Sequence, residues 1–267
     1  MTMKNKERLE CLLSFTTPAF LGGPDQAAEW RTPPLKALIR QWWRVAHCHG
    51  KAVPPAELRA REGELFGRAG MASGENGGAR GESAGPRVSR VRIRLESWHG
   101  RIANAGDWQK SKFGSVGSGG STVAADLYLG YGPIQLQGKR GRGTVGPERT
   151  FIPPGPDAAR RLSVAYPSDE RADLLNALRL VQAFGTVGSR SRNGWGSVEL
   201  RATESTAPPL SPEALARMVD EGNADSREWL RLFARPWRDA LDFDWTAGAG
   251  NGADWCHALG SDERGLL

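Results

Sequence analysis

The chain has 267 residues, a formal net charge of +6, 34 glycines, 10 tryptophans and only three cysteines. Three scattered cysteines are too few for a disulfide framework, and no apolar run reaches the roughly 18 residues of a membrane span. The polar N-terminal stretch lacks the apolar segment of a signal peptide. These features argue against a disulfide-rich secreted module and a membrane protein, and they predict a cytoplasmic location.

The positive charge is concentrated in the first part of the chain. Residues 1–200 contain 29 Lys and Arg against 18 Asp and Glu, whereas the chain from Arg201 onward contains 7 against 12. This asymmetry predicts a basic body that meets a polyanion, followed by an acidic extension. The alternative is a scattered charge that serves only solubility, and composition does not separate the two.

The N-terminal part predicts a strand followed by an amphipathic helix. Residues 10–16 (ECLLSFT) have the composition of a strand, and apolar side chains recur with helical spacing over residues 35–48. The opposite side of that helix carries Lys36, Arg40 and Arg44. Such a basic stripe indicates either a solvated helix surface or a contact with a polyanion.

Two stretches predict insertions around a further strand. Residues 50–87 are rich in Gly, Ala, Arg and Glu and predict a mobile loop, and residues 111–121 predict a second flexible insertion. Between them, residues 88–98 (VSRVRIRLESW) alternate apolar side chains with arginines, which is typical of a strand with one basic face.

A strand-like stretch and a basic loop follow. Residues 123–137 resemble a strand interrupted by GYGP, and residues 138–146 (GKRGRGTVG) form a short glycine-rich connection. The connection carries Lys139, Arg140 and Arg142, which are candidates for contacts with phosphate groups.

The remaining pattern completes the predicted fold. We expect a strand at residues 161–166, a helix at 168–184, a short strand at 197–200 and a mainly helical acidic extension over 201–267. The order of elements predicts an α+β fold with a ferredoxin-like βαββαβ core, enlarged by insertions, in residues 1–200.

The glycine-rich loop GTVGSRSRNGWG, residues 185–196, is the strongest local signal. Glycines allow close approach of the backbone, guanidinium groups suit phosphates, and an indole suits an unstacked base. The candidate RNA-binding residues here are Gly188, Arg190, Arg192, Gly194 and Trp195. The alternative is a glycine-rich connection that only links a helix to a strand. The pattern of a P-loop is absent.

These stretches resemble a known family. The loop GTVGSRSRNGWGS resembles the C-terminal glycine-rich loop of RAMP proteins, LSFTTPAFLGGPDQAAEWRTPPLKALIRQWWR resembles the start of the first Cmr-type subunit of type III-B CRISPR systems, and YLGYGPIQLQ resembles its mid-chain element. The resemblance covers about residues 9–200. It implies a ferredoxin-like fold, binding of crRNA or its duplex with target RNA, and assembly with other RAMP subunits in antiviral defence.

For individual residues, the resemblance points to Lys36, Arg40, Arg44, Arg190 and Arg192 as RNA contacts. The chain departs from the family in one respect. Cmr-type first subunits usually contain a second ferredoxin-like domain, and only 67 residues follow Leu200 here.

Catalysis is the main alternative function. Asp25 follows the first strand, near the position where type III backbone subunits are expected to carry a target-cleaving aspartate, although an Asp after Gly-Gly-Pro is ordinarily a turn residue. His47 and His49 flank Cys48 and do not converge on one metal, so we expect no metal and no cofactor.

Three hypotheses therefore remain. The favoured one is a non-catalytic RNA-binding subunit. The others are a RAMP endoribonuclease that cleaves target or repeat RNA, and an architectural subunit whose basic face binds acidic proteins.

Overall fold

The computed structural model describes residues 6–48, 53–69, 85–109, 114–117, 122–137 and 144–203. It also describes three short strands, β9 (Arg235–Pro236), β10 (Ala247–Ala249) and β11 (Trp255–Cys256), in which β10 pairs with β9 in parallel and with β11 antiparallel. The helices expected within residues 201–267 lie outside the described residues. None of the described helices is long and apolar enough to cross a membrane.

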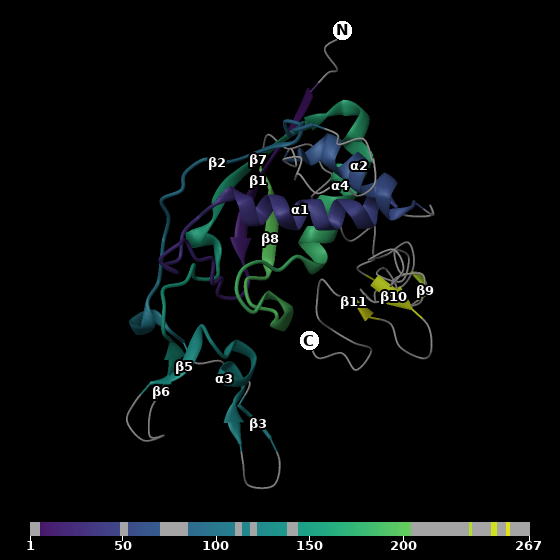
Figure 1. Ribbon diagram of the computed structural model, residues 1–267. Helices are drawn as coiled ribbons and strands as arrows, with labels where there is room; N and C mark the ends of the chain where they lie inside the picture. The colour runs from purple at the N-terminus through teal and green to yellow at the C-terminus, as the bar shows by residue number, and fades with distance from the viewer. Residues whose placement is uncertain are drawn as a thin grey trace, which may run out of the picture.

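A four-stranded sheet organises the body of the protein (Figure 1). Its strands are β1 (Lys6–Phe15), β2 (Arg92–Leu95), β7 (Arg160–Pro167) and β8 (Val198–Ala202), in the order β2-β7-β1-β8. All neighbours are antiparallel. Along β1 the buried side chains alternate with more exposed ones, so that one face of the strand enters the core.

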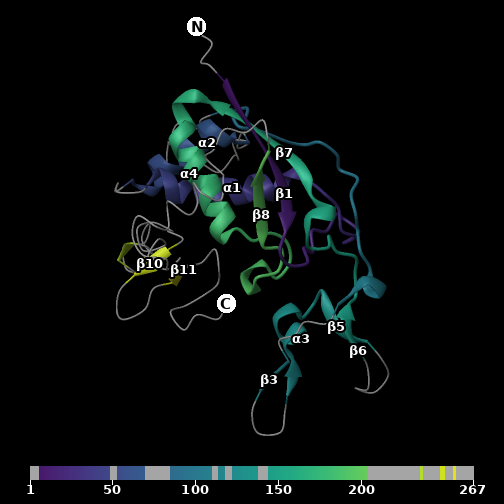
Figure 2. The ribbon, with the colours of Figure 1, turned by 180° about the vertical axis from the view of Figure 1, so that it is seen from behind.

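Two long helices pack on this sheet, α1 (Thr32–His47) and α4 (Arg171–Phe184) (Figures 1 and 2). The apolar side of α1 is buried, as its periodicity predicted, and Trp42 packs on Phe184 of α4 with ring centroids 5.8 Å apart. The expected strands at 10–16, 161–166 and 197–200 and the expected helices at 35–48 and 168–184 are all present, with boundaries shifted by a few residues.

A third helix, α2 (Pro55–Phe66), occupies part of the range in which the sequence predicted a loop. The inner side of α2 carries the buried side chains of Leu58, Leu65 and Phe66. It also carries Glu62, which is only 1 % exposed. A carboxylate on the inner side breaks the apolar pattern from which a helix is recognised. The expectation of an unstructured insertion over residues 50–87 was therefore wrong for the part that forms α2, and residues 70–84 lie outside the described part.

Two further expectations need correction. The strand predicted over residues 88–98 is reduced to β2, because the amides of Arg90 and Val91 donate to the carbonyl of Leu65 instead of entering the sheet. The strand-like stretch 123–137 is divided into β4 (Val123–Ala124), α3 (Ala125–Gly130) and β5 (Ile134–Gln137).

The middle of the chain forms a smaller unit beyond one end of the sheet (Figures 1 and 2). Strand β5 pairs with β6 (Thr144–Pro147), and β4 pairs with β3 (Ser115–Val116). Ile134 joins Phe20, Ala103, Phe151 and Trp195 in a second buried cluster, apart from the main core. Short 3-10 helices complete the described elements: η1 (Ala105–Asp107), η3 (Pro156–Ala158), η4 (Ser168–Glu170) and η5 (Ser191–Asn193).

Candidate nucleic-acid interface

The glycine-rich loop lies directly on the turn that follows β1. The amide of Ser189 donates to the carbonyl of Phe20 at 3.0 Å, and the amide of Gly196 donates to the carbonyl of Pro18 at 3.0 Å. Two stretches that the sequence singled out separately, TTPAFLGG and GTVGSRSRNGWG, are therefore one structural unit.

The hydroxyl of Thr17 connects the two stretches further. It donates to the carbonyl of Gly194 at 2.6 Å and accepts a hydrogen bond from the amide of Ser197 at 3.0 Å. The hydroxyl of Ser197 also donates to the Gly194 carbonyl, at 2.8 Å. The conformation of the loop is thus held by side chains as well as by backbone pairing.

The glycines of the loop approach protein backbone. Gly188 has a φ of +100°, and a Cβ there would lie 2.8 Å from the carbonyl oxygen of Phe20. Gly196 has a φ of +69°, and its Cβ would lie 2.0 Å from the carbonyl oxygen of Val187. Gly194 also has a positive φ, +82°. The fold of the loop itself excludes a side chain at Gly188 and Gly196 and favours glycine at Gly194, and no contact with RNA is needed to explain these residues.

Trp195 is a core residue, which corrects the expectation that its indole offers a stacking surface to a base. The side chain is 7 % exposed, and its ring lies 5.9 Å from that of Phe20 and 5.8 Å from that of Trp108. The indole nitrogen has no hydrogen-bond partner among the described residues, so that the ring contributes packing alone. The structure places Trp195 as the anchor of the loop.

The basic stripe of α1 faces α2. Arg44 binds Glu62 through two hydrogen bonds, Nε to Oε1 at 3.0 Å and Nη2 to Oε2 at 2.8 Å, and Arg40 Nε also donates to Oε1. Burial raises the pKa of Glu62, but the hydrogen bonds and charges of Arg44 and Arg40 outweigh it, so the pKa lies below its ordinary value. Burial, helped by the charge of Arg40, lowers the pKa of half-buried Lys36.

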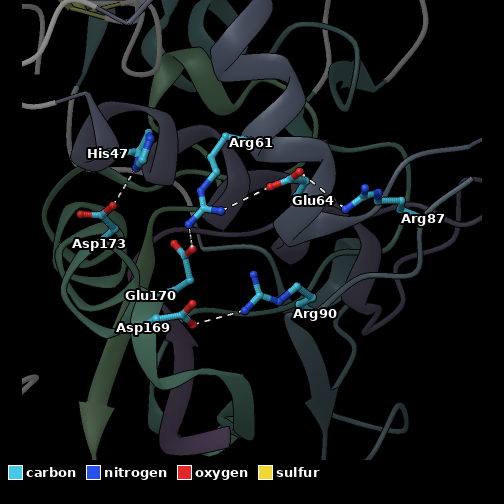
Figure 3. A network of polar contacts seen from close by, with 8 residues as sticks. All are labelled: His47, Arg61, Glu64, Arg87, Arg90, Asp169, Glu170 and Asp173. Carbon is cyan, nitrogen blue, oxygen red and sulfur yellow. Dashed lines mark hydrogen bonds and ion pairs between the residues drawn. The ribbon is translucent and has the colours of Figure 1, made fainter. Parts of the chain in front are cut away.

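The neighbouring surface of α1, α2 and α4 is similarly paired (Figure 3). His47 Nδ1 lies 2.8 Å from Asp173, and its ring stacks on Trp43 with centroids 4.6 Å apart. Arg61 bridges the carboxylates of Glu64 and Glu170, whereas Arg87 pairs with Glu64 and Arg90 with Asp169. Most of the positive charge on this side is thus already neutralised within the protein.

The two loop arginines lie at the surface. Arg190 adopts a left-handed conformation with a φ of +59°, and its Nε donates to the carbonyl of Tyr131 at 2.6 Å. Arg192 is exposed and has no ion-pair or hydrogen-bond partner among the described residues. Asn193 donates from Nδ2 to the carbonyl of Leu129 at 2.7 Å. The loop thereby holds the end of α3 against the body.

A surface hollow of about 620 Å³ opens beside these arginines. Its wall includes Arg149, which donates to Gln26 Oε1 at 2.9 Å and to Ser189 Oγ at 2.8 Å. We call it the Arg149 hollow. Its lining residues are Pro24, Asp25, Gln26, Tyr131, Gly132, Pro133, Glu148, Arg149, Ser189 and Arg190.

Sequence reasoning missed Tyr131, Glu148 and Arg149 as site residues. Tyr131 lies in the YLGYGP stretch that carried part of the family resemblance, and Glu148 and Arg149 follow the basic connection. They meet the glycine-rich loop only through the tertiary fold. Lys139, Arg140 and Arg142 lie between the ends of β5 and β6, outside the described residues.

The side chains that line the Arg149 hollow are suited to binding an anion. Asp25 lines it, but one carboxylate oxygen accepts the amide of Ala27 at 3.1 Å, as in an ordinary Asx turn. No histidine lines the hollow, and no group of three metal-ligating side chains occurs among the described residues. Two guanidinium groups and an exposed phenol ring are suited to holding an anion that carries an aromatic group.

One comparison with known proteins identifies the family. A family model described as the RAMP superfamily matches residues 13–199. No curated protein matches the sequence. Among solved structures, the chain is similar to Cmr1 from Pyrococcus furiosus in its apo form, with 17% identity and a TM-score of 0.42 over 91% of this chain and 63% of that one.

A second similar structure is the Type III-B Cmr-beta complex bound to cognate target RNA, with 13% identity and a TM-score of 0.35 over 73% of this chain and 59% of that one. The chain thus spans less than two thirds of the length of either structure. The family match covers more than half of the chain and includes β2, β7, both long helices and the glycine-rich loop. The chain belongs to the RAMP superfamily.

Proposed function

We propose that the protein is a non-catalytic RNA-binding subunit of a type III CRISPR effector, which contacts crRNA or its duplex with target RNA and neighbouring RAMP subunits. Membership of the RAMP superfamily supports this function. A ferredoxin-like core is part of the proposal. The sheet order β2-β7-β1-β8, with α1 between β1 and β2 and α4 between β7 and β8, supports it.

The observation that carries the proposal is that two arginines line one hollow and a third is exposed in the adjoining loop. Arg149 and Arg190 line the same hollow, and Arg192 is exposed in the same loop. Guanidinium groups bind phosphate oxygens through two parallel hydrogen bonds, and they keep their charge at all physiological pH values. RNA contact is therefore proposed at the Arg149 hollow and the glycine-rich loop.

The α1 stripe has a smaller part in this proposal. Arg40 and Arg44 already neutralise a buried carboxylate, and a phosphate would have to compete with Glu62 for them. We propose that these arginines hold α2 on α1. Contacts by Lys36 and by Lys139, Arg140 and Arg142 remain predictions.

A salt series tests RNA binding. Because bound phosphates release counterions, the logarithm of affinity falls linearly with the logarithm of salt concentration. Replacing both Arg190 and Arg192 by Ala should weaken binding of a labelled RNA about equally across sequences. It should also reduce the magnitude of the salt slope by about 1 for each lost contact.

The matched control removes the same charge elsewhere. Arg59 is exposed on α2, and Arg101 forms only an exposed ion pair with Asp157 at 3.4 Å. Replacing both by Ala should leave the slope near that of the unchanged protein. Equal effects of the two double variants would indicate that RNA is attracted generally to the basic body. That result would contradict the assignment of the RNA contact to the glycine-rich loop.

Incubation with labelled repeat and target RNA, with and without Mg²⁺, separates the binding hypothesis from the endoribonuclease. We expect the RNA to stay intact. Cleavage that Asp25→Ala abolishes would establish the endoribonuclease instead.

A further inference from the structure

Tyr131 combines a fixed backbone with an exposed ring. Its carbonyl accepts the Nε hydrogen of Arg190 at 2.6 Å, and two residues earlier the carbonyl of Leu129 accepts a hydrogen bond from Asn193 at 2.7 Å. The side chain is nevertheless 66 % exposed. Because the main chain is held in place, stacking of a base on the ring does not require the backbone to become ordered, which favours binding.

Side chains of both charges line the hollow together with Tyr131. The guanidinium groups of Arg149 and Arg190 provide positive charge, and Arg149 is positioned by its hydrogen bonds to Gln26 and Ser189. The carboxylates of Asp25 and Glu148 line the same hollow, where Asp25 accepts the amide of Ala27 and Glu148 accepts the side-chain amide of Gln135. Guanidinium groups suit a phosphate, and carboxylates accept hydrogen bonds from the amino groups of bases, so the hollow offers partners for both ends of a nucleotide.

We propose that the Arg149 hollow is a subsite for one unpaired nucleotide of a bound RNA strand, with the base stacked on Tyr131 and the phosphate beside Arg149 and Arg190. This inference rests on the proposed RNA binding and names the form of RNA that the site takes. The volume of about 620 Å³ is in the range of small-ligand sites.

The subsite favours single strands over duplexes. A base within a helix must lose its stacking and pairing before it can enter, at a cost of a few kcal/mol, whereas an unpaired base pays much less. In this proposal Tyr131 stacks on the base, a role that the sequence indicated for Trp195. The indole of Trp195 is only 7 % exposed and has no free face for stacking.

The test compares Tyr131→Ala with a closely matched control, Tyr128→Ala. Tyr128 lies on α3 with 64 % exposure, close to the 66 % of Tyr131, but it does not line the hollow. The probe is a short fluorescein-labelled single-stranded RNA, and the measurement is its dissociation constant by anisotropy at several salt concentrations.

We expect Tyr131→Ala to weaken binding by about 5- to 150-fold, the range that corresponds to one stacked base. The salt slope should stay the same, because no phosphate contact is lost. Tyr131→Phe should restore binding, and Tyr128→Ala should bind like the unchanged protein. A probe of the same length without bases should bind equally to the unchanged protein and to Tyr131→Ala.

The outcomes separate this proposal from the proposed function. Unchanged affinity of Tyr131→Ala, or an equal loss in Tyr128→Ala, would overturn the subsite and leave RNA binding intact. Failure of the unchanged protein to bind any RNA would overturn both. Thermal unfolding of each variant verifies that a loss of affinity does not come from loss of the fold.

Discussion

The rings of Trp195 and Phe20 meet edge to face, with centroids 5.9 Å apart and an angle of 64° between their planes. Trp195 comes from the glycine-rich loop and Phe20 from the turn after β1, so this contact joins two stretches far apart in the sequence. Phe151 and Trp108 complete the cluster. The cluster thus joins the glycine-rich loop to the turn after β1.

We expect Trp195→Ala to lower the free energy of unfolding by about 3–5 kcal/mol, the usual cost of deleting a buried aromatic ring. The RNA affinity of the folded fraction should remain close to that of the unchanged protein. Denaturant unfolding and anisotropy measure the two quantities. Trp98→Ala, at a ring that is 68 % exposed, is the control and should leave stability nearly unchanged. Normal stability with lost affinity in Trp195→Ala would return a stacking role to this residue.

The hydroxyl of Thr17 should stabilise the loop measurably. Thr17→Val keeps the shape of the side chain but leaves the amide of Ser197 without its acceptor, at a cost of about 1–2 kcal/mol. The neighbouring Thr16 is exposed, and Thr16→Val should have little effect. The measurement is the midpoint of thermal unfolding for both variants. Equal midpoints would show that water replaces the lost hydrogen bond.

Gly196→Ala tests whether the loop needs its glycine for close approach or for conformation alone. The new Cβ would meet the carbonyl oxygen of Val187 at 2.0 Å, so that the backbone has to move. Gly155 also has a positive φ, +99°, but nothing lies within 4 Å of its Cβ position. Gly155→Ala should therefore cost only the conformational penalty, about 1–3 kcal/mol, and Gly196→Ala should cost clearly more. Denaturant unfolding of the two variants checks this order, and the reverse order would contradict it.

The Glu62 cluster predicts a dependence of stability on pH. Because the pKa of Glu62 is lowered in the folded state, its contribution to stability is present above the ordinary value of about 4.3 and is lost as pH falls through the lowered pKa. Glu62→Gln should lower the free energy of unfolding by about 1–3 kcal/mol at neutral pH, since both arginine partners are partly exposed.

Below the ordinary carboxyl pKa the difference between Glu62→Gln and the unchanged protein should shrink, because protonation removes the same charge from the unchanged protein. Unfolding curves at neutral and acidic pH measure this convergence. Glu57→Gln, at an exposed position of the same helix, is the control. A gap that stays constant with pH would show that the charge of Glu62 does not carry the effect.

The sequence by itself predicted the elements whose signals are local. The period of the apolar residues identified α1 and α4, and short apolar runs identified β1, β7 and β8. The glycine- and arginine-rich loop and the N-terminal turn also carried the family resemblance, because their conformations depend on residue types at fixed spacing. These features need no knowledge of distant partners.

Only the tertiary structure decided what each of these segments contacts. Helix α2 was hidden because its inner side carries Glu62, which is compatible with burial only when Arg40 and Arg44 of α1 lie opposite. The burial of Trp195, which the sequence had suggested as a stacking surface, has a similar cause. The ring of Trp195 is buried against Phe20 and Trp108, which lie far away in the sequence. The Arg149 hollow likewise exists only where four separate segments of the chain meet.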